Sequence, residues 1–292
     1  MRINANGLLR GFFSALLPTF FMGFAYAAEA KDVGLLWKLE APTGKISHLF
    51  GTMHSDDPRI NDFSPALKQA MKDSEAFMME VLPASDPGIY LMENGQNLHE
   101  LMDEKEIDKV LALAEFHSMH REAALTMKPW LLAMIFDLPK PQSPFTQDVM
   151  LYSIAESQGL EVLGLEDTKE HFASLDSFSR EDQLTMLRAV LKRSQEEKEK
   201  DFDALLKAYL SGDTAKIGLL DDDITGGMLP KSLWQRMRVK LLDERNVRMA
   251  ERIVNEANET PVFVAVGASH LAGSGGLLER LRAAGYKVSK VE

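Results

Sequence analysis

The sequence predicts an α/β fold: a mixed, largely parallel central sheet with flanking helices and a large helical insertion. Three observations lead to this prediction. Short apolar runs alternate with helical segments at both ends of the chain. The clearest of these runs, residues 261–266, is continuously apolar, which is typical of strands buried on both faces of a parallel sheet. Between the runs at the two ends, residues from about 169 to 257 carry an almost unbroken helical pattern, and we expect this stretch to form the insertion.

The first strands are expected near the start of the globular part. Residues 45–50 (KISHLF) are a strand candidate that ends at a glycine. Residues 37–39 precede it across a Pro-Thr-Gly turn, so the two runs should pair as antiparallel strands. Residues 286–291, at the end of the chain, are expected to form an edge strand.

Three further runs predict the interior of the sheet. Residues 76–81 are apolar except for Glu80, and residues 160–165 are followed at once by Glu166. Residues 261–266 form a continuous run of β-branched, aromatic and small apolar residues bounded by proline and glycine. Each of these strands therefore ends beside a polar residue or a glycine turn.

Start and stop signals predict the helices between the strands. Ser64 and Pro65 provide an N-cap and a proline at the first helical position, while Gly159 and Gly285 close two other helices. Three prolines predict a loop over residues 138–144. The expected helices cover residues 65–72, 104–117, 146–157, 180–210 with one break, 234–257 and 276–284.

The composition restricts the class of protein. The 292 residues are 45% hydrophobic and 26% charged, as is usual for a globular protein. A formal net charge of -11 argues against a nucleic-acid partner, because phosphate binding requires a basic face. The absence of cysteine excludes a disulfide scaffold, a thiol nucleophile and a cysteine-ligated metal.

Residues 1–27 have the pattern of a secretory signal peptide. A short arginine-containing segment is followed by an uncharged run over residues 11–25 and by a small-x-small cleavage signature that ends at Ala27. The alternative is a membrane anchor, but the run is borderline in length and contains Pro18. We expect cleavage near Ala27, no stable membrane insertion, a periplasmic or secreted location, and a single domain over residues 28–292.

Two Gly-x-x-His turns directly follow predicted strands. They comprise Gly51 with His54 and Gly267 with His270. Chance alone gives roughly 0.5 such spacings in this composition. The spacing itself is therefore weak evidence, and the stronger evidence is that both turns directly follow a predicted strand. Glycine at these positions is expected to allow a positive φ or a close backbone approach.

Four polar side chains should meet at one edge of the sheet. The working crevice of an open α/β sheet lies beyond the carboxyl ends of its strands. His54, Glu80, Glu166 and His270 all occupy such ends. A histidine at a strand end is more often an ordinary hydrogen-bonding residue. Glu80 is the strongest anomaly, because a carboxylate in an apolar strand is costly unless it is paired or metal-bound.

Two imidazoles and two carboxylates can bind a divalent Mn, Co, Zn or Fe ion. Such an ion lowers the pKa of bound water, and a carboxylate outside the metal shell can act as general base. We expect His54, His270 and Glu166 as metal ligands and Glu80 as base or ligand. The sequence does not decide which of the two glutamates binds the metal and which acts as the base. The other histidines are expected to be structural or solvated: His48, His99, His117, His120 and His171.

Three segments, in this order, resemble the TraB/GumN family, which includes the Tiki-type metalloproteases: LFGTMHSDDPRI, GLED and VAVGASHLAGSGGLLERLRAAGYKV. The resemblance covers residues 35–288. It implies an α/β core similar to erythromycin esterase and ChaN-like folds, and a Mn- or Co-dependent protease site. The positions that match the family pattern are Gly51, His54, Glu80, Glu166, Arg245, Asn246, Gly267 and His270.

Arg245 and Asn246 admit two interpretations. Arg245 could hold a substrate carboxylate or stabilise an oxyanion, or it could form a salt bridge that fixes Glu80 or Glu166. The overall prediction is an exported metal-dependent hydrolase, most simply a peptidase, that acts on a peptide or small-molecule substrate. The alternatives are a haem- or iron-binding periplasmic module and a metal-free esterase that uses His and Glu as an acid–base pair.

Overall fold

A six-stranded mixed sheet forms the centre of the protein, in the order β4-β3-β5-β2-β1-β6. The computed structural model describes residues 32–292, so the predicted signal peptide lies outside the described residues. Strands β2, β5, β3 and β4 are parallel neighbours, while β1 pairs antiparallel with both β2 and β6. The six predicted strands are confirmed, with these bounds: β1 Leu36–Glu40, β2 Ile46–Thr52, β3 Ala76–Val81, β4 Glu161–Glu166, β5 Val262–Gly267 and β6 Lys287–Lys290.

Helices cover both faces of this sheet. One face packs against α2 (Pro65–Lys72) and α6 (Gln147–Gln158), and the other against α12 (Glu244–Ala257) and α13 (Leu277–Ala283). Alternation along the strands decides the face. Phe77 points to the first pair of helices, whereas its neighbour Met78 points to the second. The parallel strands are therefore buried on both sides, as their apolar sequences predicted.

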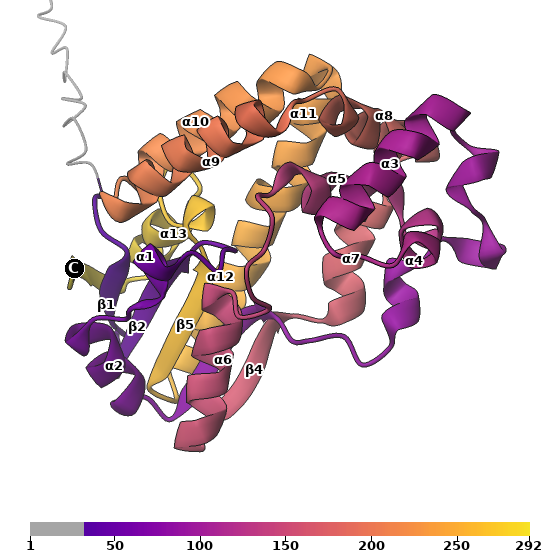
Figure 1. The fold of residues 1–292 in the computed structure, drawn as a ribbon. Helices are drawn as coiled ribbons and strands as arrows, with labels where there is room; N and C mark the ends of the chain where they lie inside the picture. The colour runs from indigo at the N-terminus through magenta and orange to yellow at the C-terminus, as the bar shows by residue number, and fades with distance from the viewer. Residues whose placement is uncertain (1–31) are drawn as a thin grey trace, which may run out of the picture. The chain divides into compact units, whose positions relative to one another are not determined.

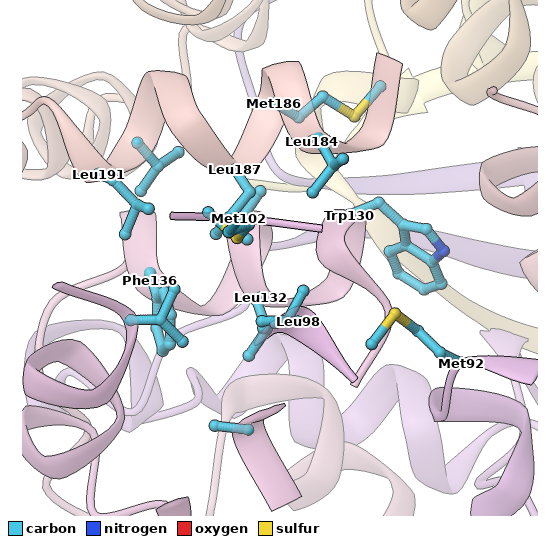
Figure 2. Packing of buried hydrophobic residues seen from close by; sticks show 14 of the residues in the cluster. Met92, Leu98, Met102, Trp130, Leu132, Phe136, Leu184, Met186, Leu187 and Leu191 are labelled. Carbon is cyan, nitrogen blue, oxygen red and sulfur yellow. The ribbon is translucent and has the colours of Figure 1, made fainter. Parts of the chain in front are cut away.

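Several of the remaining helices share a second apolar core around Trp130, Phe136 and Leu187, as Figure 2 shows. This core draws on two parts of the chain, α3–α5 and then α7, α8 and α11, whereas α12 returns to the sheet. Helices α9 and α10 run side by side in Figure 1 and pack in a separate apolar cluster that includes Ile60 and Ala268. The bounds are α3 Glu104–Phe116, α4 Arg121–Thr126, α5 Pro129–Asp137, α7 Thr168–Asp176, α8 Arg180–Leu191, α9 Gln195–Leu210, α10 Thr214–Met228 and α11 Lys231–Arg238.

The predicted helices are found with small differences. The break expected within 180–210 separates α8 from α9. The helix expected over 234–257 is interrupted by a π-helical turn at Val239–Asp243. Helix α5 was not predicted, because its sequence is apolar on nearly every side and gives no helical period. Short elements complete the chain: α1 Pro58–Asn61 and 3-10 turns at Pro87–Tyr90, Glu93–Gly95, Leu98–Glu100 and Ala268–His270. Within residues 32–292, every helix is too short or too polar to cross a bilayer.

Candidate functional site

The predicted site residues come from the carboxyl ends of four adjacent parallel strands. Glu80 lies near the end of β3, and Glu166 is the last residue of β4. His270 ends the 3-10 turn after β5, and His54 follows β2 by two residues. Because these strands are neighbours in the sheet, their ends form one continuous rim.

Arg245 joins the two glutamates of this rim. It lies on α12, where its Nη2 donates to Glu80 Oε2 and its Nε donates to Glu166 Oε2 at 2.8 Å. Arg245 and Glu166 are buried and Glu80 is mostly buried, so water has little access to these ion pairs. The salt-bridge interpretation of Arg245 therefore describes its position in the structure. Burial alone would raise the pKa of Glu80, but the charges of Arg245, His270 and His54 hold it well below its usual range.

Glu166 is enclosed by donors. Arg248 donates to its Oε1 at 2.9 Å, Arg245 occupies Oε2, and His171 Nδ1 lies 3.0 Å from that same oxygen. Burial opposes ionisation, but these hydrogen bonds and charges lower the pKa of Glu166 to about 2. Its side chain has no exposed surface. His171, which the sequence gave no reason to select, therefore belongs to the network.

His270 is held in one orientation by Asn246. Its Nδ1 donates to Asn246 Oδ1 at 2.7 Å, and the amide nitrogen of Asn246 donates in turn to the Gly275 carbonyl. This arrangement leaves the lone pair on His270 Nε2, which lies 3.7 Å from Glu80 Oε1 and 3.4 Å from Arg245 Nη1. Burial lowers the pKa of His270 to about 4, so the ring is neutral near pH 7.

His54 forms a second oriented imidazole, at the solvent side of the rim. Its Nδ1 lies 2.7 Å from Asp148 Oδ2, and Asp148 Oδ1 accepts a hydrogen bond from Thr52 at 2.6 Å. The charge of Asp148 raises the pKa of His54 to about 9. The His54 side chain is 63% exposed, so solvent reaches the ring and screens this pair. Asp148, on α6, was not predicted.

The two motif glycines are required for space rather than for an unusual φ. Neither Gly51 nor Gly267 has a positive φ, so that part of the expectation was wrong. A Cβ at Gly51 would lie 2.6 Å from Leu271 Cδ1, and one at Gly267 would lie 3.2 Å from Glu80 Oε1. The Gly267 amide also donates to Glu80 Oε1 at 2.6 Å. The close backbone approach that was expected is confirmed.

The sequence model of the TraB/PrgY/gumN family matches residues 35–290. The chain belongs to this family. It is also similar to an uncharacterised protein of Treponema pallidum (strain Nichols), with 22% identity over 273 residues. This alignment covers 85% of the present chain and 80% of the Treponema protein.

The positions of the side chains in this TraB/PrgY/gumN protein favour a different set of three metal ligands from the predicted set of His54, His270 and Glu166. Glu166 does not fit, because three donors, on Arg245, Arg248 and His171, surround its two oxygens and its side chain has no exposed surface. His270 Nε2 and Glu80 Oε1 fit better. Among the described residues Oε1 accepts only the Gly267 amide, which leaves it a lone pair, and ligands bonded at about 2.0–2.2 Å to one ion can be 3.7 Å apart. His54 is the third candidate. Within residues 32–292, no three His, Asp or Glu side chains already form a compact metal cage.

Two further features suit a cation at this position. Both His54 and His270 have an oxygen acceptor at Nδ1, which is the usual outer-shell arrangement of metal-binding histidines. The charges are also unequal when the histidines are neutral. Three carboxylates, on Glu80, Asp148 and Glu166, face only two guanidinium groups. A proton on His54 or a bound cation would balance the remaining negative charge.

A small cavity adjoins His54. It has a volume of about 170 Å³ and is lined by the 138–143 loop, by His117 and by Phe202 of α9, among others. Pockets that enclose drug-sized ligands measure roughly 300–1,000 Å³, so this cavity suits one side chain of a larger substrate. A larger cavity of about 650 Å³ lies between α8 and the end of α10 and is lined by none of the rim residues.

Proposed function

We propose that this TraB/PrgY/gumN protein is an exported metal-dependent hydrolase, most simply a peptidase, with its active site at the rim. The observation that carries the proposal is the pair of oriented imidazoles, His54 and His270, beside the ionised Glu80. The export step rests on the sequence pattern of residues 1–27. The choice of a peptidase rests on the resemblance to Tiki-type proteases.

In this proposal, the chain's own residues prepare the site. His270, Glu80 and His54 would hold a Mn, Co or Zn ion, which when bound supplies an activated water near neutral pH. Asn246 keeps the His270 lone pair on Nε2. Asp148 orients the His54 ring, and because the pKa of His54 is raised to about 9, a proton would have to leave its Nε2 before that atom could bind a metal. Arg245 keeps Glu80 ionised and in place.

The pKa values favour holding roles for the glutamates. A general base works best when its pKa lies near the working pH. The pKa of Glu80 is held far below its usual range, and the pKa of Glu166 is about 2. Both are weak proton acceptors near pH 7. We therefore assign Glu80 to metal binding and Glu166 to the positioning of Arg245.

A metal-free hydrolase is the second candidate, and the His54–Asp148 pair favours it. A carboxylate that orients a histidine and stabilises its imidazolium form is the arrangement of the Ser-His-Asp hydrolases. In this version, His54 takes the proton from the attacking water and returns it to the leaving group. The side chain of His54 is exposed, and its pKa of about 9 means that it can accept a proton only in the fraction that is deprotonated, so this candidate predicts hydrolysis that speeds up as the pH rises towards 9.

One experiment separates the candidates. The chain from residue 28 would be incubated with a peptide mixture and with simple esters, and the products identified by mass spectrometry. The first candidate predicts that a chelator stops hydrolysis and that added Mn or Co restores it. The second predicts hydrolysis that resists the chelator but is lost in His54→Gln. Equal hydrolysis by His54→Gln and the exposed control His99→Gln would reject both.

The haem-binding alternative has its own test. The cavity beside His54, at about 170 Å³, is small for a macrocycle. We therefore expect haem titration to leave the Soret band of free haem unchanged. A shifted Soret band that disappears in His54→Ala or His270→Ala would favour the binding module instead.

A further inference from the structure

Most of the accessible surface that lines the cavity beside His54 is apolar. The lining includes five aliphatic or aromatic side chains, which are Ile135 and Leu138 at the end of α5, Pro139 and Pro141 in the following loop, and Phe202 on α9. Leu138 is 43% exposed, so a ligand can reach it. An apolar group of a ligand that covered these side chains would remove apolar surface from water, which favours binding.

His117 also lines the cavity, although the sequence favoured a solvated position for it. That expectation was wrong, because only 7% of the residue is exposed. Its ring stacks on Phe136 with centroids 5.7 Å apart and meets Phe116 edge-on. Burial lowers the pKa of His117 to about 4, so the ring is neutral near pH 7. His117 therefore adds an aromatic residue without a charge to the wall.

Two acidic residues of the wall, Asp56 and Asp57, are bound within the chain. Asp56 accepts the backbone N–H groups of Gln142 and Ser143 at 2.6 and 2.5 Å. Asp57 caps α1 and pairs with Arg59 at 2.7 Å. These bonds hold the segments that form the wall, so both carboxylates support the shape of the cavity.

Lys140, a basic residue of the wall, raises the alternative of an acidic ligand. It is exposed, and its Nζ lies 5.8 Å from the centroid of the Phe116 ring. An exposed ion pair adds less than about fivefold to an affinity, and the carboxylate of Asp56 in the same wall opposes an anion. Burial of a side chain of leucine size adds about tenfold or more. The wall therefore favours an apolar occupant over an acidic one.

The volume of the cavity, about 170 Å³, suits one side chain. An apolar cavity of about 150 Å³ holds a benzene molecule. Side chains of leucine, methionine and phenylalanine therefore fit, whereas alanine would leave most of the space empty. His54 contributes to the wall from the rim, while His117 and Phe202 contribute from the end of α3 and from α9. The helices thus determine which side chain can lie beside the rim.

We propose that this cavity binds an apolar side chain of the substrate, about the size of leucine, beside the scissile peptide bond. The term substrate rests on the proposed hydrolase function. His54 lines the cavity and belongs to the rim, so a side chain held in the cavity keeps the adjoining peptide bond close to the rim. The substrate class is therefore a peptide with leucine, methionine or phenylalanine at the cleavage site.

Binding of small probes tests this subsite without any need for hydrolysis. The probes are the N-acetyl α-amides of leucine, alanine, glutamate and lysine. In NMR titrations of the mature chain, we expect the leucine probe to bind at least about fivefold more tightly than each of the others. Its methyl protons should show nuclear Overhauser effects to the Phe202 ring. A smaller preference over any of the other three probes would overturn the proposal.

Two variants change the wall without changing the rim. Leu138→Asn makes an exposed part of the wall polar, and we expect it to weaken the leucine probe at least about threefold. Met134→Asn is the matched control, because Met134 is 53% exposed on α5 and lies outside the lining of the cavity, so it should bind like the wild type. Ile135→Ala enlarges the cavity, so the N-acetyl amide of phenylalanine should gain at least about threefold on the leucine probe. A loss of fold stability alone would leave this ratio unchanged.

The subsite is rejected if Leu138→Asn binds the leucine probe like the wild type and Ile135→Ala leaves the ratio unchanged. Digestion of a peptide mixture separates the subsite from the proposed function. Cleavage beside leucine, methionine or phenylalanine supports both. Hydrolysis without that preference removes the apolar subsite and leaves the proposed function standing. Selective probe binding by a chain that hydrolyses no peptide removes the proposed function and leaves an apolar ligand site.

Discussion

Replacing Arg245 by methionine tests the network that holds the rim together. The guanidinium makes buried ion pairs with Glu80 and Glu166. Removing one partner of a buried pair costs about 3–5 kcal/mol, because a charge stays buried without compensation. Glu166 retains Arg248 and Glu80 retains the Gly267 amide. We therefore expect a loss near the lower end of that range.

The assay is urea unfolding at pH 7, followed by circular dichroism and tryptophan fluorescence. At this pH the depressed pKa of Glu80 contributes its full stabilisation, which is lost as the pH falls through the native pKa. Arg236→Met is the control, because Arg236 pairs with Asp182 at the surface and should contribute at most about 1 kcal/mol. If Arg245→Met costs no more than Arg236→Met, the buried network does not stabilise the rim.

Two further changes test the packing and the cavity. Gly51→Ala should destabilise the fold by about 1–3 kcal/mol, because the new Cβ meets Leu271. Gly218→Ala is the control. Gly218 lies on α10, where the new Cβ has no neighbour within 4 Å, so this variant should be neutral or stabilising. The pKa of His117 is lowered to about 4, so unfolded chains bind protons before native ones as the pH falls from 6.5 to 4. The free energy of unfolding of the wild type, measured by urea titration, should therefore fall over this window by about 3 kcal/mol more than that of His117→Phe. Parallel pH profiles of the two proteins would contradict the expectation for His117. A Gly51→Ala variant as stable as the wild type would contradict the expectation for Gly51.

Much of the sheet follows from the sequence because its strands are buried on both faces. A strand of this kind leaves a continuous apolar run that ends at a polar rim, as residues 261–266 illustrate. The helical layer was harder to predict. Helix α5 has no polar face, and the pairing of α3–α5 with α8 depends on contacts between distant parts of the chain.

The site was predicted where chemistry and strand ends coincide, as at His54, Glu80 and His270. Asp148 was missed because its partnership with His54 spans 94 residues and has no local signal. His171 lies five residues after Glu166, at the start of the following helix. Because only a short loop separates Glu166 from the next helix, a polar residue near the start of that helix could have been expected to contact Glu166, and His171 is such a residue. Whether Glu166 or Glu80 stands beside the imidazoles depends on Arg245, which comes from a different element.

The most direct test of the account is the metal content of the purified mature chain, measured by elemental analysis after dialysis against Mn, Co or Zn. We expect about one equivalent per chain in the wild type and in the exposed control His99→Ala. His54→Ala and His270→Ala should each retain less than about a tenth of it while their circular dichroism spectra stay native. Wild-type metal content in both of these variants would contradict the account.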